Sequence, residues 1–578
     1  MEAAGFAPEA VVATERRSPA PVLILLATLG LFALADAAGA SKKVAPLVLL
    51  VVPIVLAHRT IFRWRNLLAA IVLVVMFIPM RRYVMAGGVG FQLDPYRLLV
   101  GIVLLGWIVS LLVDSRVRVR RSGFELQMAV ILGSVLCSDA ANGPLIHDLG
   151  VGGEVAKKLI FFFTFVFIYY LSVSVLQSHE DVDLVLKVLV ALGAIVALTA
   201  VAEFRSGFNT FDHLAKLLPF LQKLPYIPEA GRGGHVRAYA SSEQPIAMSA
   251  VFVMLIPVSI YVALRTAQRR WWVAVAALIL GAFATTSRTG VTMLIAVAFV
   301  FLRLRPRETK RSWRILIVVL LLSKVVAPGA IGTLRYEFFP DGKFNLAGLI
   351  AQQDKGSGGF RRGRVGRLSQ AWPHISEQPV LGQGYGTRTV GRWGALDWNS
   401  TTVDDEWLKT LLETGLVGVV GWFWMFRAFG ARAKRLARSD DGPLGWLAVS
   451  LWAAVAAYGV GMLTYDAFSF IQVTVILFLL LGLGAVTFRL AESNVDAPAL
   501  AEEPGRPEPP KRPIPVPPAI ALREVERDDP DDDGDEHVGR KRRRGLRLRP
   551  VDQSWAVTFI LGSLLVSAWQ AVRSRSVG

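Results

Sequence analysis

Long runs of apolar residues recur along the chain from Pro21 to Phe488, and many of them approach the length of a membrane-spanning helix. A helix needs about 20 mostly apolar residues to cross the hydrocarbon core of a bilayer. Hydrophobic residues make up 53% of the 578 residues and charged residues only 19%, which excludes an ordinary soluble enzyme. The sequence therefore predicts an all-α, polytopic integral membrane protein.

About fourteen transmembrane helices are predicted, within a range of 13–15 because some of the runs are short. The predicted spans cover residues 21–38, 44–57, 66–80, 98–113, 124–138, 159–176, 184–204, 245–264, 271–286, 289–302, 313–328, 407–426, 444–464 and 467–488. The first run follows Glu15, Arg16 and Arg17 and has features of a signal peptide, but no soluble domain follows it. We therefore predict a retained span.

Basic clusters predict the orientation of these spans. Lysine and arginine exceed the acidic residues by 18, and the clusters follow the second, fourth, eighth, tenth and twelfth spans. Because cytoplasmic loops of membrane proteins are enriched in these residues, residues 1–20 and all five clusters are predicted to be cytoplasmic. The surplus then reflects topology, and no nucleic-acid partner is expected. Arg81, Arg82 and the acidic loop 177–183 are exceptions to the pattern.

Two long loops, residues 205–244 and 329–406, fall on the outer face in this orientation, as does the short turn that contains Arg288. The second loop is small for a domain with its own core, so we expect it to pack on the membrane domain 21–488 as a cap. Chemistry on the outer surface is the natural expectation.

The C-terminal region changes in composition. Residues 489–552 contain a proline-rich stretch, an acidic run and a basic run, which predicts a disordered cytoplasmic linker. Residues 553–572 are apolar again, and they are predicted to form either an additional span or an interfacial helix.

Several common catalytic signatures are absent from the sequence, including a Walker phosphate-binding loop, the zinc motif His-Glu-x-x-His and Gly-x-Ser-x-Gly. With one cysteine, Cys137, and no cluster of cysteine and histidine, neither a metal nor another cofactor is expected. The glycine-rich segment GQGYG at 382–386 lacks the lysine and the preceding strand of a phosphate-binding loop. A flexible turn is the expected structure there.

Four arginines on the predicted outer side are candidates for anion binding. A guanidinium group can hold two phosphate oxygens at once, and near a membrane boundary it needs an anion, carbonyl groups or water. The candidates are Arg237, Arg288, Arg364 and Arg367. The alternative is that these side chains reach lipid headgroups or hold the loops together.

Two aspartates, Asp404 and Asp405, lie where the second outer loop re-enters the membrane at the start of a predicted helix. One of them could accept a proton from, or orient, an acceptor hydroxyl group, so both are candidate catalytic residues together with Arg288. The alternative is acidic capping, because the N-terminus of a helix favours negative charge.

Three separated segments resemble the O-antigen ligase and polymerase superfamily of bacterial membrane glycosyltransferases. They are RAYASSEQPIAMSAVFVMLIP from Arg237, TTSRTGV from Thr285, and the stretch from GRVGRLSQAW to ETGLVGVVGWF. The resemblance spans 237–425. Its motif positions are filled by Arg367, Trp372, Pro379, Gly382, Gly384, Asp404, Asp405, Trp407, Leu408, Glu413, Gly415, Leu416 and Gly418.

This resemblance implies a GT-C-related membrane architecture with a long extracytoplasmic loop. It also implies metal-independent transfer of a glycan from a polyprenyl-pyrophosphate donor to a sugar hydroxyl of a glycan or glycolipid acceptor. The reaction would take place on the outer face of the bacterial cytoplasmic membrane, in contact with its lipids. By position, Arg237 and Arg288, together with Arg364 or Arg367, would bind the pyrophosphate.

The acceptor side departs from the family pattern, because Asp404 occupies the place of the family's histidine. The departure suggests a carboxylate base or a different acceptor. Two other histidines on the predicted outer side, His235 and His374, are not in register with the motif.

Two other functions remain open. A transporter or flippase of an anionic or lipid-linked substrate could use the same arginines, with Lys187 and Lys324 along its path. No inverted repeat in the hydropathy pattern supports that alternative. The charged tail would suit a structural partner of an envelope-polymer assembly.

Overall fold

The computed structural model describes most of the membrane region. Within the described residues the protein is mostly helical and contains two strands of three residues each, so the predicted all-α class is confirmed at this level. The described residues are 64–85, 94–113, 117–218, 221–224, 236–311, 364–388 and 405–501, without the side chains of 311, 364–370 and 494–501. The predicted spans 21–38, 44–57 and 313–328, and the region 502–578, lie outside the described residues.

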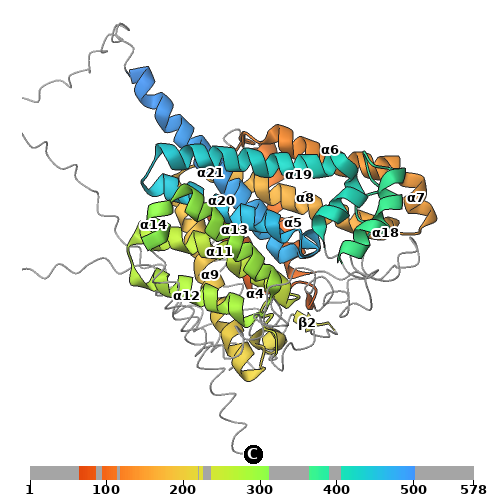
Figure 1. Cartoon of the computed structure of the whole chain (residues 1–578), viewed down its shortest axis with the longest axis horizontal. Coiled ribbons are helices and arrows are strands. Elements are labelled where there is room, and N and C mark those ends of the chain that lie inside the picture. The colour runs from red at the N-terminus through yellow and green to blue at the C-terminus, as the bar shows by residue number, and fades with distance from the viewer. Residues whose placement is uncertain are drawn as a thin grey trace, which may run out of the picture. The chain divides into compact units, whose positions relative to one another are not determined.

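Each of the eleven other predicted spans coincides with one helix (Figure 1). These helices are α4 (Trp64–Phe77), α5 (Pro95–Val113), α6 (Glu125–Ala141), α8 (Gly152–Val175), α9 (His179–Ser206), α11 (Pro245–Thr266), α12 (Arg269–Ala284), α13 (Arg288–Leu304), α19 (Glu406–Ser439), α20 (Pro443–Gly461) and α21 (Ile471–Ala501). By length and apolar composition, seven of them can cross a membrane: α5, α8, α9, α11, α19, α20 and α21. The total of about fourteen spans stays a prediction.

Short elements connect these helices. They are β1 (Tyr83–Met85), α7 (Gly143–Asp148), the 3₁₀ helix η1 (Thr210–His213), α10 (Leu214–Leu217), β2 (Leu221–Lys223), α14 (Pro306–Arg311), α18 (Arg364–Glu377) and the 3₁₀ helix η4 (Ala467–Ser469). β1 and β2 form an antiparallel pair in which Tyr83 faces Lys223. This pair joins the segment after α4 to the loop after α9.

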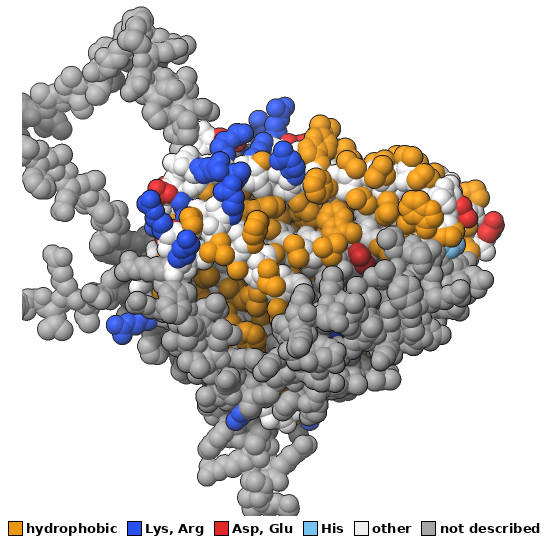
Figure 2. Space-filling model, in the orientation of Figure 1, with side chains coloured by type: hydrophobic (Ala, Val, Ile, Leu, Met, Phe, Trp, Pro, Cys, Tyr) orange, Lys and Arg blue, Asp and Glu red, His pale blue; other side chains and the backbone are white. Residues whose placement is uncertain are grey.

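Two apolar helices form the centre of the bundle. All residues in the most apolar stretch of α21 are buried, as are 89% of the residues in that of α11. α21 packs against α8, α20 and α11. Helices that are apolar on every side belong in such a position. By contrast, only 22% of the residues in the most apolar stretch of α5 are buried, and side chains such as Leu112 and Val109 are exposed. Figure 2 shows broad patches of hydrophobic side chains on one face. Such apolar surface is suited to contact with lipid.

α19 and α21 continue well past the C-terminal ends of the spans predicted for them. α19 continues past residue 426 to Ser439, so the basic cluster that was expected to follow the span is part of the helix. The regular geometry of α19 is broken at Gly415, where φ is 65° and ψ is −164°. α21 continues past residue 488 to Ala501, into the segment predicted to be disordered.

Ion pairs explain the acidic loop that conflicted with the predicted orientation. The Arg65 guanidinium lies 3.2 Å from the Asp181 carboxylate, and that of Arg265 lies 3.5 Å from Asp183. Asp183 also accepts a hydrogen bond from the Tyr261 hydroxyl, at 2.6 Å. All of these residues belong to helix ends that were predicted to be cytoplasmic. The acidic residues of the loop therefore neutralise arginines of the same face.

A buried arginine explains another exception. Arg82 is 0% exposed, and its guanidinium donates to the carbonyl oxygens of Ala240 and Ser242, at 2.8 Å each, and to the Asp212 carboxylate. This arginine holds together loops that were all predicted to be outer. These contacts join only loops that were predicted to lie on the same side of the membrane, as the ion pairs above do. Which side of the membrane that is stays a prediction.

Candidate functional site

The segment that begins at Arg237 lies against the turn between α12 and α13. The backbone N–H of Ala238 donates to the carbonyl of Ala284 at 3.3 Å, and Nε of Arg237 donates to the carbonyl of Thr285 at 3.4 Å. Arg237 is only 2% exposed. Arg288 is the first residue of α13, and the short turn that begins at Thr285 leads into it. Two of the four candidate arginines thus belong to one local structure.

Polar groups surround the start of α13. The hydroxyl groups of Ser287 and Ser249 are buried and have no hydrogen-bond partner among the described residues. α11 approaches closely here, since a Cβ atom at Gly290 would lie 2.1 Å from Oγ of Ser249. The N-terminus of a helix carries a partial positive charge, and Arg288 adds a full one. Such a combination of N–H groups, hydroxyls and guanidinium is suited to binding an anion.

Strained backbone is concentrated around this turn. Thr286 has a φ of 46°, Ala240 of 41° and Arg81 of 59°, values in the left-handed region that residues with a side chain rarely adopt. These residues belong to segments that contact one another through Arg82 and Arg237. Strain of this kind is maintained by surrounding contacts and is found most often at functional sites.

A buried carboxylate fixes the Arg237 segment from the other side. Glu203 on α9 is 1% exposed. Its carboxylate accepts hydrogen bonds from the backbone N–H groups of Tyr239, at 3.3 Å, and Ala240, at 2.8 Å, and from the side chain of Asn209 at 3.0 Å. Together with Arg82, Glu203 leaves this segment little freedom to move. Glu203 was not among the residues predicted from sequence, although a carboxylate near the end of an apolar helix is a recognisable signal.

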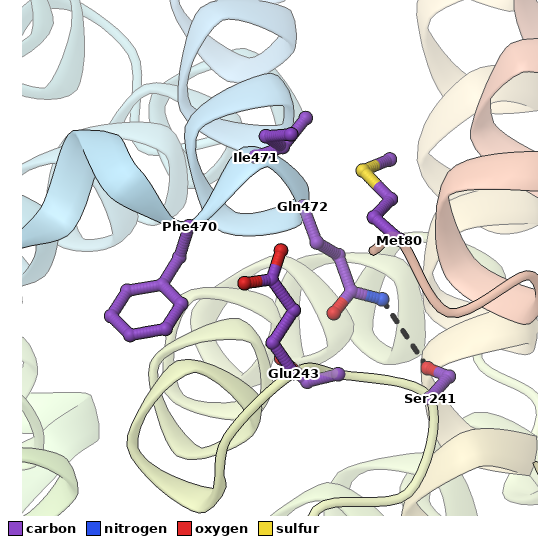
Figure 3. A pocket seen from close by; sticks show the side chains of 7 residues that line it. Met80, Ser241, Glu243, Phe470, Ile471 and Gln472 are labelled. Carbon is purple, nitrogen blue, oxygen red and sulfur yellow. Dashed lines mark hydrogen bonds between the residues drawn. The ribbon is translucent and has the colours of Figure 1, made fainter. Parts of the chain in front are cut away.

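A small pocket lies beside this segment, between the end of α4 and the start of α21 (Figure 3). The side-chain N–H of Gln472 donates to Oγ of Ser241 at 3.2 Å and to the carbonyl of Val75 at 2.9 Å. Glu243 also lines the pocket, and its carboxylate forms a 3.2 Å ion pair with Arg81. Burial raises the pKa of the Glu243 carboxyl, and the Arg81 guanidinium opposes that rise.

The glycine motif GQGYG of the second outer loop lies directly against the break at Gly415 in α19. Around the break at Gly415, the N–H of Leu416 donates to the carbonyl of Pro379 at 2.9 Å, and the N–H of Gln383 donates to that of Leu412 at 2.8 Å. A Cβ atom at Gly415 would lie 2.2 Å from the carbonyl oxygen of Val380. Residues 379–384 therefore supply hydrogen-bond partners for the backbone groups that the break in α19 exposes. The predicted turn is present, and these hydrogen bonds hold it in place rather than leaving it flexible.

α6 completes this arrangement with three polar side chains. Oγ of Ser138 donates to the carbonyl of Glu413 at 2.6 Å, and the side chain of Asn142 donates to that of Gly382 at 2.9 Å. The Asp139 carboxylate accepts from the N–H of Tyr385 at 2.6 Å. Helix, turn and helix break are thus fixed to one another.

Arg388, at the end of this turn, was not among the candidates from sequence. Its backbone N–H donates to the Glu413 carboxylate at 3.1 Å, and its guanidinium donates to the side chain of Gln383. Burial lowers the pKa of Arg388 to about 10, and the carboxylates of Glu413 and Glu377 oppose the shift. The side chain is therefore cationic at neutral pH.

A buried ionic network joins the start of α19 to the segment before α21. Nζ of Lys409 lies 2.8 Å from the Asp466 carboxylate and 3.2 Å from Oγ of Ser469, which also accepts from Nζ of Lys158 at 3.0 Å. Burial alone would raise the pKa of Asp466, but the Lys409 ammonium outweighs it and holds the pKa below its usual range. The sequence EWLKTLLE contains the signal, since Glu406, Lys409 and Glu413 share one helix face.

The cavity beside this network is too small for a sugar. It measures about 10 Å³ and is lined by Glu406 and Glu413 among other residues, a volume comparable to that of a single water molecule. The Glu406 carboxylate accepts from the N–H of Phe468 at 2.8 Å. These charged side chains therefore join the start of α19 to the segment before α21.

The remaining predicted site residues lie around the start of α19. Oδ1 of Asp405 accepts from the N–H of Leu408 at 3.1 Å, so Asp405 caps the helix, as its alternative interpretation required. Arg364 and Arg367 belong to α18, which packs through Ala371 and Ile375 against Leu408 and Leu412; the side chains of both arginines lie outside the described residues.

Three predicted residues remain to be placed. Asp404 and His235 lie outside the described residues. His374, on α18, is half-buried, and burial together with Arg388 lowers its pKa. No group of three or more histidine, cysteine, aspartate or glutamate side chains in the described segments could hold a metal ion.

Comparison with known proteins gives one match. The family model described as O-antigen ligase matches residues 272–423. No curated protein matches the chain. The matched region includes the Arg288 turn, α18, the turn in GQGYG and the break at Gly415. The resemblance to the O-antigen ligase and polymerase superfamily is thereby confirmed.

Proposed function

Because residues 272–423 match the O-antigen ligase family, we propose that this protein transfers a glycan from a polyprenyl-pyrophosphate carrier to a sugar hydroxyl of a glycan or glycolipid acceptor. The acceptor oxygen forms a bond to the anomeric carbon of the donor, and the bond from that carbon to the pyrophosphate breaks. The hydroxyl proton passes to a base, and the polyprenyl pyrophosphate leaves with the bonding electrons. The reaction takes place on the outer face of the bacterial cytoplasmic membrane.

The junction of Arg237 with the turn before α13 is the main support for this proposal. A departing pyrophosphate carries negative charge, and donors that are already in position stabilise that charge without reorganisation. Arg237 is held by the carbonyl of Thr285, and Arg288 lies at the N-terminus of α13. We assign both arginines to the pyrophosphate, with Arg364 and Arg367 of α18 as further ligands.

The acceptor side belongs to the start of α19. Asp405 is occupied as a helix cap, and this contact leaves Asp404 as the better candidate for the base. Asp405 then acts by fixing the backbone that follows Asp404. No metal takes part in this proposal, because the two arginines supply the positive charge.

The test is an assay with the purified full-length protein and a polyprenyl-pyrophosphate glycan. We expect Arg288→Ala and Arg237→Ala each to lower the rate by about 100-fold or more, the usual effect of removing one such donor. Arg307→Ala is the matched control, because Arg307 is an exposed arginine on α14. EDTA should leave the rate unchanged.

Two outcomes would contradict the proposal. One is full activity in correctly folded Arg288→Ala protein. The other is the absence of product with every donor while vesicles containing the protein move the lipid-linked glycan across the bilayer, which would establish a flippase.

A truncation separates an enzyme from a scaffold. Deleting residues 502–578 should leave transfer activity intact, whereas a scaffold that acts through its tail would lose its effect. The cut must spare Arg489, whose guanidinium donates to the carbonyls of Val173 and Leu176, at 3.1 Å each.

A further inference from the structure

A groove of about 930 Å³ lies along α13, α19 and α20, at helix ends that were predicted to be cytoplasmic. Its floor includes Phe299, Phe426 and Trp452. Its rim is basic and comprises Arg303, Arg427, Lys434, Arg435 and Arg438. The groove is separate from the Arg237 and Arg288 turn, and glycan transfer gives it no role.

The basic residues of the rim share one side of the helix. Arg427, Lys434, Arg435 and Arg438 are separated by seven, one and three positions, a spacing that places them along one face of α19. All four are exposed, as is Arg303 on α13. Among the described residues, none of the five has an ion pair or a side-chain hydrogen bond.

Neighbouring arginines show that charge at this end can be used for packing. Arg305 pairs with Asp441 and donates to the carbonyl of Asp440 at 2.6 Å. The guanidinium of Arg432 lies 4.7 Å from the centre of the Phe124 ring. The rim cations differ from both, so their positive charge is available to something outside the described fold.

The floor of the groove is apolar and accessible. Phe299 is 66% exposed, and Phe423, which also lines the groove, is 63% exposed. At Gly430 a Cβ atom would lie 2.7 Å from the Trp452 ring, so glycine allows that ring to lie against α19. In Figure 2, blue side chains gather beside orange ones where Figure 1 shows α14 and the C-terminal half of α19.

We propose that this groove binds an anionic phospholipid, with the phosphate on the basic rim and an acyl chain on the aromatic floor. Basic residues next to a membrane helix attract anionic lipids, and the volume of the groove lies in the range of ligand-binding pockets. Free phosphate would leave the floor bare. An acidic peptide would pair with the basic residues of the rim but would also leave the aromatic rings uncovered. A lipid supplies both parts in one molecule.

The test uses spin-labelled phosphatidylglycerol and spin-labelled phosphatidylcholine added to the full-length protein in phosphatidylcholine vesicles. The fraction of immobilised label gives the relative affinity. The unaltered protein should prefer phosphatidylglycerol several-fold. The triple variant Lys434→Gln, Arg435→Gln, Arg438→Gln should lose this preference, since each cation near the surface is worth about fivefold in affinity.

The matched control removes three other exposed cations from the same predicted face, as Arg269→Gln, Arg307→Gln, Lys310→Gln. It should keep the preference, and an equal loss in both triple variants would overturn the proposal in favour of general surface charge. A second variant, Ala431→Trp, fills the groove without removing a cation. It should also reduce binding, and unchanged binding would show that the apolar floor has no role and overturn the proposal.

Two further results would count against the proposal. Competition by inorganic phosphate as strong as that by unlabelled phosphatidylglycerol would show an anion site rather than a lipid site. Equal immobilisation of the two labelled lipids by the unaltered protein would show that the rim does not select charge.

Discussion

At the scale of single residues, Gly415 determines whether the turn in GQGYG can lie against α19. Its φ of 65° is unfavourable for any residue with a side chain, and a Cβ atom there would overlap the carbonyl of Val380. We expect Gly415→Ala to destabilise the protein by about 1–3 kcal/mol from backbone strain, and by more from the overlap. Unfolding in mixed detergent and SDS micelles measures this loss.

The control for this prediction is Gly106→Ala on α5, where a Cβ atom would meet nothing within 4 Å. Alanine is the better helix former by about 1 kcal/mol, so this change should be neutral or stabilising. Equal losses in the two variants would mean that the contact around Gly415 does not form.

The buried pair of Lys409 and Asp466 gives a second prediction at this scale. Replacing one partner, as in Lys409→Met or Asp466→Leu, leaves a buried charge without its partner, and we expect a loss of about 3–5 kcal/mol. The double variant should lose less than the sum of the two single losses. A double-mutant cycle on the free energy of unfolding measures the coupling, and additive losses would contradict the interaction.

Some of these residues could be identified from the sequence, and others could not. Arg237 and Arg288 became candidates because arginines near a membrane boundary stand out in an apolar sequence. Glu203 and Arg82 did not, because their importance lies in contacts between segments that are far apart in sequence. Asp405 could be assigned either role from its position, and its contact with the N–H of Leu408 was needed to show the cap.

At the scale of elements, the N-terminal cap of α19 gives Asp405 a structural role, and a variant can test whether it also has a catalytic one. Asparagine at position 405 can still accept the hydrogen bond from Leu408, but it cannot accept a proton. We expect Asp405→Asn to retain most of the transfer activity, and Asp405→Ala to cost about 1 kcal/mol of stability. A transfer assay and an unfolding measurement on the same samples test both statements. Loss of activity in a stable Asp405→Asn protein would make Asp405 catalytic.

The positions of the helices were largely predictable, because a long apolar run indicates a helix buried in lipid or in protein. The ends of α19 and α21 were not, since a helix can continue past the apolar run when neighbouring contacts hold it, as Arg489 does on α21. The break at Gly415 was also hidden, because glycine in an apolar helix is common and gives no sign of its φ angle.

At the scale of the whole molecule, the predicted orientation can be tested directly. The chain has one cysteine, so Cys137→Ala gives a background without thiols. We expect a membrane-impermeant thiol reagent to label Asp148→Cys in intact cells and to label Lys310→Cys only after the membrane is opened. Both positions are exposed. The reverse pattern would place Arg237 and Arg288 in the cytoplasm and contradict glycan transfer on the outer face.

The contacts of the turn in GQGYG have a consequence for engineering. The backbone of Arg388 is tied to Glu413 of α19, and the chain returns to that same helix at Asp405. Both anchor points of residues 389–404 are therefore supplied by one scaffold helix. Chimeras that exchange residues 389–403 and keep Asp404 should have a stable frame, which makes this segment a practical starting point for altering the proposed choice of acceptor.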